Sequence, residues 1–254
     1  MKTMLKVPVY LTLVIGLPTA TNSGQPSLHP AKAAPQVVTV SYAVIKNSND
    51  FILPKRHSMK FVDAYIRNND EDLALVKKRS VKPFVIMDSV FKRYGIPPEL
   101  KYLAVIESEL KTTAVSRVGA TGPWQLMAGT ARELGLKVNG RYDERTNYYK
   151  STKAAAKYLR DLHNEFKDWL LVLAAYNAGP LPVYKAIHRS NSRDFWALER
   201  YLPKETRGHV KHFIATAIYF QESREMEKRA LESQEMERRA LESQEIDSHE
   251  IAIL

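Results

Sequence analysis

Apolar residues recur at intervals of three and four along most of the chain, which is the pattern of helices that bury one face. The pattern predicts helices within residues 59–94, from about 98, from about 128, and over 151–166, 168–178 and 205–220. A short strand or, as an alternative, a helical segment is expected at Val37–Ile45. The sequence therefore predicts a mainly α fold.

One of these helices carries a carboxyl group on its apolar face. Pro98 suits a first helical turn, and Leu100, Leu103, Ala104 and Glu107 then fall at i, i+3, i+4 and i+7. Glu109 lies about 200° further round at roughly 100° per residue, so we expect it on the surface. A carboxyl group at an apolar edge can hold a proton near neutrality, as a general acid must. The alternative is a buried glutamate that is satisfied by an arginine or by backbone amides.

The helix over residues 168–178 repeats the arrangement with an amide. Leu170, Leu173, Ala174 and Asn177 share one face, and Gly179 with Pro180 is expected to stop the helix. The preceding helix is expected to be capped by its serine, Ser151. Polar residues thus end two apolar stripes.

The N-terminus has the layout of a secretory signal peptide. Lys2 and Lys6 precede an apolar run over 7–17 that is too short for a confident membrane span, and small residues follow. Cleavage is expected after Ala20 or Ala33, with an uncleaved anchor as the alternative. We therefore expect an exported protein of the periplasm or cell envelope, with membrane anchoring only through an uncleaved N-terminal segment.

Composition narrows the chemistry. The 254 residues include no cysteine, which excludes disulfides, thiolate metal sites and cysteine nucleophiles, and the seven histidines show no HExxH spacing. We therefore expect no metal and no cofactor. Residues 1–220 hold 33 Lys and Arg against 18 Asp and Glu, whereas 221–254 hold five against ten. For an exported protein, so basic a body favours a polyanionic envelope component over nucleic acid as the partner.

The C-terminal segment contains a tandem repeat, EMEKRALESQ followed by EMERRALESQ. Glu225 with Arg229 and Glu235 with Arg239 are spaced for ion pairs along a helix. A ten-residue period makes the apolar positions wind around the axis and form no fixed stripe. We therefore predict a solvated helical tail, with a partner-binding helix as the alternative.

Several longer motifs occur in order between residues 57 and 220. They are YGIPPELKYLAVIES, SRVGATGPWQLM, YDERTNYYKSTKAAAKYLRDL, DWLLVLAAYNAGP and LPKETRGHV. Together they resemble the soluble lytic transglycosylase (SLT) domain family and, within it, the membrane-bound lytic murein transglycosylase D group. The resemblance implies a lysozyme-like helical catalytic domain. The organisation expected is 1–33 signal peptide and linker start, 34–80 N-terminal extension, 81–220 catalytic domain and 221–254 charged helical tail.

The resemblance also implies an activity: cleavage of the β-1,4 bond between N-acetylmuramic acid and N-acetylglucosamine in glycan strands of peptidoglycan, leaving 1,6-anhydro ends without consuming water. Glu107 would be the sole catalytic carboxyl group, acting first as acid and then as base. Ser116 would orient the acetamide or this carboxyl group, and Gln125 and Met127 would line the saccharide site.

The remaining candidate residues follow from the same resemblance. Tyr176 and Asn177 would hydrogen-bond near the acid, while Ser108 would support the helix turn beside it. Trp124 and Tyr176 have core packing as their simpler interpretation. Gly122 is expected in a turn, and would also let sugar approach the backbone.

The chain departs from the family pattern at one position. His209 follows ETRG where the family usually has a tyrosine whose hydroxyl faces the catalytic glutamate. This change supports one alternative to the transglycosylase, an inactive peptidoglycan-binding protein. A lysozyme-type hydrolase is the other alternative. The oligomeric state and the choice between endo and exo cleavage do not follow from the sequence.

Overall fold

The computed structural model describes residues 59–253, and in this part of the chain every regular element is helical. The elements are α1 (Met59–Tyr94), η2 (Pro98–Lys101), α2 (Tyr102–Ser108), α3 (Ala128–Glu133), η3 (Glu144–Thr146), α4 (Tyr148–Phe166), α5 (Trp169–Ala178), α6 (Pro180–Ser190), α7 (Phe195–Leu198), η4 (Glu199–Tyr201) and α8 (Lys204–Ile253). The predicted mainly α fold is confirmed. The predicted signal peptide, linker and strand lie outside the described residues.

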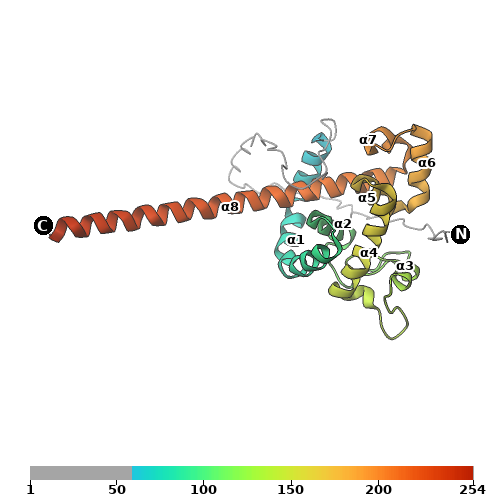
Figure 1. Ribbon diagram of the computed structural model, residues 1–254, viewed down its shortest axis with the longest axis horizontal. Coiled ribbons are helices and arrows are strands. Elements are labelled where there is room, and N and C mark those ends of the chain that lie inside the picture. The colour runs from blue at the N-terminus through green and yellow to red at the C-terminus, as the bar shows by residue number, and fades with distance from the viewer. Residues whose placement is uncertain (1–58, 254) are drawn as a thin grey trace, which may run out of the picture.

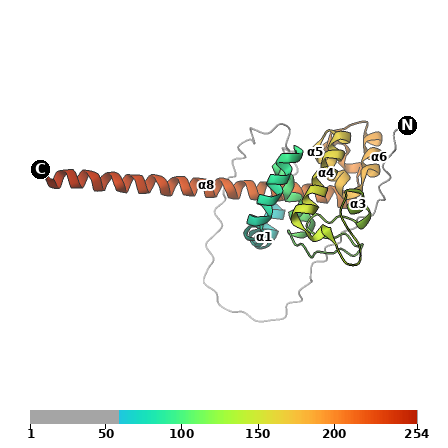
Figure 2. The same ribbon diagram turned by 60° about the horizontal axis from the view of Figure 1, so that its bottom comes forward.

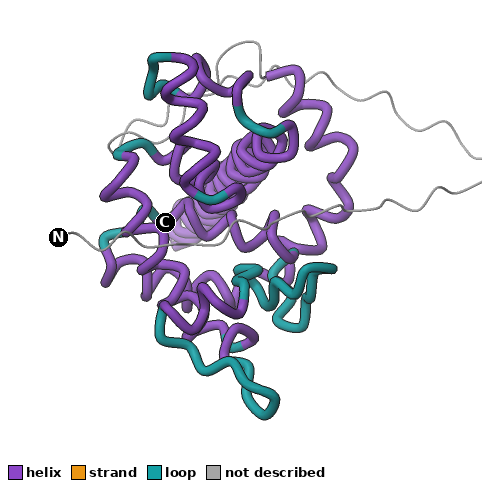
Figure 3. The backbone as a smooth tube through the Cα atoms, turned by 90° about the vertical axis from the view of Figure 1, so that its right-hand side faces the viewer, coloured by secondary structure: helices purple, strands orange, loops and turns teal. Residues whose placement is uncertain are grey.

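The helices gather around the first half of α8. Figure 1 shows α8 running out of the helical body toward the C-terminus, and Figure 2 shows the same arrangement from a second direction. Seen along its axis, α8 passes between the other helices (Figure 3). Helices α1, α2 and α5 all pack against it. The body is therefore built on one long helix.

The first helix, α1, carries the expected apolar positions. Met87, Val90 and Phe91 are fully buried, and Gly95 at φ +65° follows the last residue. The helix bends at Asn69, whose φ of −126° is not helical and whose side-chain amide donates to the carbonyl of Tyr65. α1 also crosses residue 80, where the sequence suggests a domain boundary.

The fifth helix, α5, lies in the centre of the body. Nine of its ten residues are buried, and it contacts α4, α6 and α8. A helix that is apolar all round is a core helix, so the predicted stripe ending at Asn177 is only part of its buried surface. The Asp168 carboxylate caps it by accepting the Leu171 amide at 2.8 Å. Gly179, at φ +79°, ends it as expected, and Pro180 then begins α6.

The expected cap of α4 is wrong. The helix begins at Tyr148, three residues before Ser151, and its cap is Asn147, whose side chain accepts the amide of Lys150. The Ser151 hydroxyl donates to the Asn147 carbonyl from inside the first turn. Asparagine and serine cap equally well, and YDERTN brings the asparagine to the end of the preceding turn.

The last helix joins two elements that the sequence suggests separately. Val210, Phe213 and Ile214 of α8 belong to the core, whereas the described side chains from Arg224 onward lie on the surface. The predicted Glu235–Arg239 pair is present at 3.0 Å. Along α8 and the other helices of the described residues, no segment is long and apolar enough to cross a membrane.

Candidate active site

The Glu107 carboxyl group lies at the end of a buried helix. Leu103 and Ala104, on the same face of α2, are fully buried, and Glu107 itself is 5% exposed. The helix ends one residue later because Glu109 and Leu110 take left-handed conformations at φ +53° and +63°. The Glu109 side chain is 51% exposed and pairs with Lys111 at 2.7 Å. Only the first of the two glutamates therefore faces the interior.

The side chain of His209, on α8, contacts the Glu107 carboxyl group. Its Nε2 lies 2.9 Å from Oε1 of the carboxyl group, and 102 residues separate the two in sequence. One proton joins these atoms: either the imidazole donates to the carboxylate or the protonated acid donates to the imidazole. Nδ1 of His209 is buried and has no hydrogen-bond partner. The second ring nitrogen is thus open to one further partner.

Two side chains fasten the loop over residues 116–127 beside the acid. The Ser108 hydroxyl donates to the Pro123 carbonyl at 3.0 Å, and the Tyr176 hydroxyl donates to the Trp124 carbonyl at 2.7 Å. Burial and then the Glu107 charge raise the pKa of Tyr176 well above its usual value, so the phenol stays a donor. Both residues hold loop backbone next to the acid.

Trp124 belongs to the core, which agrees with core packing as the simpler interpretation of this residue. The side chain is fully buried, and its Nε1 donates to the Thr152 hydroxyl at 3.0 Å. The Tyr176 ring packs on Tyr158 with centroids 5.4 Å apart, and burial raises the pKa of Tyr158 to about 12. Aromatic packing of Tyr176 on Tyr158 and the hydrogen bond of Trp124 therefore both stabilise the residues next to Glu107.

Gln125 has a backbone conformation that few residues adopt. Its φ is +44°, which is uncommon for a residue with a side chain, and strain of this kind clusters at functional sites. The side-chain amide donates to the carbonyls of Gly122 at 2.9 Å and Ala114 at 3.2 Å. The next candidate, Met127, is half-buried and precedes α3.

The other candidates lie in the same region with different surroundings. Ser116 begins the turn of the loop, and its hydroxyl accepts the Ala120 amide at 3.0 Å. Asn177 is buried on α5 beside Tyr176. Gly122 has the expected positive φ of +82°. The space beside it is occupied by protein backbone and not left for sugar, because an added Cβ would lie 2.1 Å from the Arg145 carbonyl oxygen.

Sequence reasoning missed Arg145 as part of this region. Its guanidinium is buried and hydrogen-bonds to the 116–127 loop. The motif YDERTN contains it, but an arginine among charged residues before a helix cap ordinarily lies on the surface. The two loop carbonyls that Arg145 binds lie 19 and 26 residues before it in the sequence, and contacts at such separations leave no periodic pattern that could predict them.

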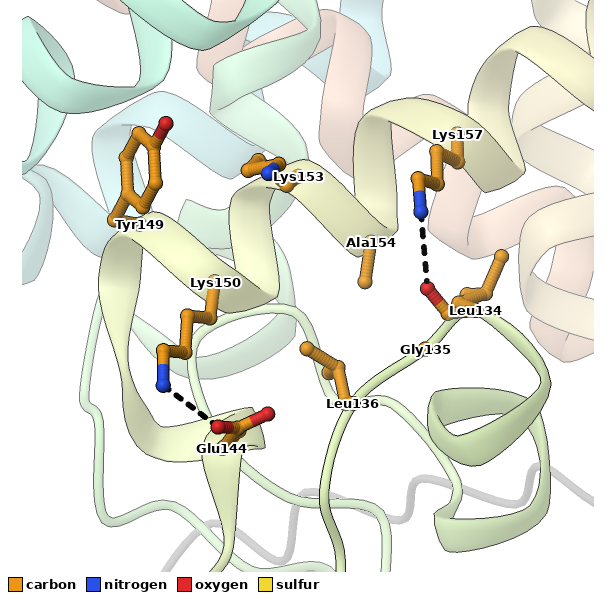
Figure 4. Close-up of a pocket in the computed structure, with 9 residues that line it drawn as sticks. All are labelled: Leu134, Gly135, Leu136, Glu144, Tyr149, Lys150, Lys153, Ala154 and Lys157. Atoms are coloured by element: carbon orange, nitrogen blue, oxygen red, sulfur yellow. Dashed lines mark hydrogen bonds and ion pairs between the residues drawn. The ribbon is translucent and has the colours of Figure 1, made fainter.

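A separate pocket of about 260 Å³ lies between α4 and the segment after α3 (Figure 4). It is lined by Leu134, Gly135, Leu136, Glu144, Tyr149, Lys150, Lys153, Ala154 and Lys157, none of which is a candidate site residue. All three of its lysines are engaged by the protein. Lys150 pairs with Glu144 at 2.6 Å, Lys157 donates to the Leu134 carbonyl, and the Lys153 ammonium lies 5.6 Å from the centroid of the Tyr149 ring. Among the described residues no three His, Asp or Glu side chains are grouped as metal ligands.

Comparison with known proteins supports the resemblance seen in the motifs. Residues 87–199 match the family model of the transglycosylase SLT domain. The chain is 38% identical over 138 residues to membrane-bound lytic murein transglycosylase D of Escherichia coli, covering 52% of this chain and 30% of that protein. It is 40% identical over 82 residues to peptidoglycan transglycosylase gp16 of phage T7, covering 32% of this chain and 6% of that one.

A solved structure gives a similar match. The lytic transglycosylase Slt of Pseudomonas aeruginosa, as an inactive mutant, aligns with a TM-score of 0.49 and 27% identity, over 55% of this chain and 24% of that one. The chain thus spans less than a third of the length of the first curated relative. The resemblance to the SLT domain is confirmed for residues 87–199.

Proposed function

We propose that this chain, with an SLT domain over residues 87–199, is a lytic transglycosylase that cleaves the bond between N-acetylmuramic acid and N-acetylglucosamine in peptidoglycan. The observation that carries the proposal is the buried Glu107 at the end of α2, with the fastened 116–127 loop beside it. The names of two relatives, a lytic murein transglycosylase and a peptidoglycan transglycosylase, support the substrate.

The reaction needs one carboxyl group in two protonation states. Protonated Glu107 donates its proton to the glycosidic oxygen, and the bond from that oxygen to C1 of the muramic acid breaks. The sugar's acetamide can stabilise the positive centre at C1. The C6 hydroxyl then attacks C1 and gives its proton to the Glu107 carboxylate, which restores the acid. A 1,6-anhydro ring forms and no water is consumed.

Glu109 does not fit the role of a second carboxylate. It follows the end of α2, lies on the surface and pairs with Lys111. A hydrolase of the two-carboxylate type needs a second acidic group across the bond, either as nucleophile or as base for a water. Among the residues that the structure describes, Glu107 is the only buried carboxyl group, which favours the transglycosylase over the lysozyme-type hydrolase.

His209 tunes the acid in this scheme. A neutral imidazole can donate one hydrogen bond to the carboxylate or accept one from the protonated acid, so it serves both steps. An imidazolium can only donate, and its charge favours the carboxylate over the acid. The first step therefore requires His209 to be neutral.

The location and partner follow from the proposed reaction. Peptidoglycan lies outside the cytoplasm, which agrees with the expected signal peptide and with a periplasmic or envelope site. The basic body, with 33 Lys and Arg against 18 Asp and Glu over residues 1–220, would be attracted to a polyanionic wall.

Product analysis tests the proposal. Digestion of purified peptidoglycan should yield muropeptides with 1,6-anhydro-muramic acid ends, one water lighter than hydrolysis products and resistant to borohydride. Glu107→Gln keeps the shape but removes the proton, so the rate should fall at least about a hundredfold. Glu109→Gln is the matched control and should change little. Reducible ends that carry oxygen from labelled solvent would establish the hydrolase instead.

A further inference from the structure

The buried arginine of η3 links the two arms of the 116–127 loop. Arg145 is 7% exposed, and its Nη1 donates to the Gly119 carbonyl at 2.8 Å and to the Leu126 carbonyl at 2.9 Å. These carbonyls lie on either side of the segment that Ser108 and Tyr176 hold. One side chain therefore closes the base of the loop.

The positive charge of Arg145 is neutralised by a carboxylate that binds two of its nitrogens, while the third nitrogen, Nη1, binds the loop. Its Nε and Nη2 donate to the two carboxylate oxygens of Asp143 at 2.9 and 2.6 Å. These hydrogen bonds from Arg145 are the main reason that the pKa of Asp143 is lowered, so the carboxylate stays charged. The planar fork of arginine allows both interactions at once, which a lysine ammonium cannot reproduce.

Backbone contact adds to the side-chain contact. The Arg145 carbonyl lies so close to Gly122 that a Cβ at the glycine would come within 2.1 Å of the oxygen. On the opposite side, Glu144 accepts from Lys150 and from the Lys137 amide at 2.8 Å, and Figure 4 shows the ion pair at the pocket wall. These hydrogen bonds, first that of the Lys137 amide, lower the pKa of Glu144 and keep it ionised. Segment η3 is therefore fixed from both sides.

Gln125, the residue of the loop with a strained backbone, directly precedes Leu126, whose carbonyl binds Arg145. Gln125, at φ +44°, is followed by Leu126, whose carbonyl accepts from both Arg145 and the Thr121 amide. A left-handed glutamine persists only where its surroundings dictate the conformation. The Arg145 contact supplies part of that constraint, immediately after the strained residue.

We propose that Arg145, held by Asp143, is a positioning residue for substrate: it fixes the conformation of Gln125 and Met127 and so the shape of the saccharide site. The inference rests on the proposed function, because it takes these residues to contact glycan. Arg145 itself acts through the loop and is not assigned a contact with the sugar.

The test compares Arg145→Lys and the milder Asp143→Asn with Arg160→Lys, in which an exposed arginine of α4 is changed. Hydrogen exchange of the 116–127 segment reports the loop, and affinity for purified glycan strands is measured in the Glu107→Gln background. In both test variants the loop should exchange faster, and affinity should fall about tenfold, the order expected when a buried charge-assisted hydrogen bond is lost. The control should match the parent protein.

Two results would overturn the positioning role. An unchanged exchange rate would show that Arg145 does not fix the loop. Faster exchange with unchanged affinity would show that the contact stabilises the fold only. Because neither measurement uses turnover, failure of the proposed reaction would appear separately, as wrong products or as an active Glu107→Gln variant.

Discussion

At the scale of single residues, the pairing of Glu107 with His209 governs what the site can do. The two atoms in contact are 2.9 Å apart in a buried setting, where charge interactions are stronger than in water. The tyrosine usual at this position cannot become positive, whereas an imidazole can. The histidine can therefore bring a positive charge next to the carboxyl group, which a tyrosine cannot do.

We expect His209→Tyr to raise activity at acid pH. When the imidazole is protonated, its positive charge would keep Glu107 in the carboxylate form, which cannot act as acid. The parent protein should therefore be several-fold slower than the variant at pH 5 and closer to it at pH 8. Rates of peptidoglycan solubilisation between pH 5 and 8 would show the difference, and superimposable profiles would contradict the role given to His209.

His212 provides the control for this pH profile. It lies three residues further along α8, and burial and then the charge of His209 lower its pKa below the usual histidine value. It therefore becomes charged only at lower pH. Its ring stacks on Tyr65 with centroids 4.9 Å apart, away from the Glu107 contact. His212→Gln should leave the shape of the profile above pH 6 unchanged.

At the scale of elements, the buried helix α5 connects the core to the site. It carries Tyr176 and Asn177 at its C-terminal end, and Asp168 caps the N-terminal end. Burial raises the pKa of Asp168, and the hydrogen bonds from the backbone amides of Leu171 and Leu170 partly offset this. The cap therefore stabilises an element on which the loop beside Glu107 depends.

Asp168→Ala should lower the free energy of unfolding by about 1 kcal/mol, the usual effect of removing a helix cap. Because the folded pKa of Asp168 is raised, the carboxylate form is disfavoured in the folded state. The difference between parent and variant should therefore shrink as the pH rises through the folded value and stay constant above it. Urea denaturation at pH 4 and pH 8 would measure both effects. Asp168→Asn is the control, since asparagine also caps and should retain most of the stability.

At the scale of the whole molecule, α8 divides into a core half and an exposed half. An ion pair between Lys77 of α1 and Glu227 at 2.6 Å joins the start of the exposed half to the body. Further along α8, ion pairs on the surface run along the helix, between Arg238 and Glu242 and between Lys228 and Glu232. These pairs support an isolated helix without contributing to the core.

Removal of residues 235–254 should leave the body intact. We expect the free energy of unfolding to change by less than about 0.5 kcal/mol, as for changes away from core features, and the solubilisation rate to stay the same. Only the helical circular dichroism signal should fall. Loss of binding to peptidoglycan after truncation would contradict the prediction of a solvated tail and favour the partner-binding alternative.

The sequence by itself determined the helices and the buried glutamate, because both depend on the 3.6-residue period of local structure. It placed Glu107 on the apolar face and Glu109 on the surface, although Glu109 is turned outward by a left-handed residue and not by a continued helix. The cap of α4 was wrong because Ser151 and Asn147 are equally good caps and the preceding turn decides between them.

Only the tertiary structure decided which distant residues meet. The contacts of Glu107 with His209 and of Arg145 with Gly119 and Leu126 join separate elements. Such contacts depend on how helices and loops pack, and they leave no periodic trace along the chain. The proposed catalytic group could therefore be found from its own neighbours in sequence, whereas the residues proposed to tune and position its surroundings required the folded chain.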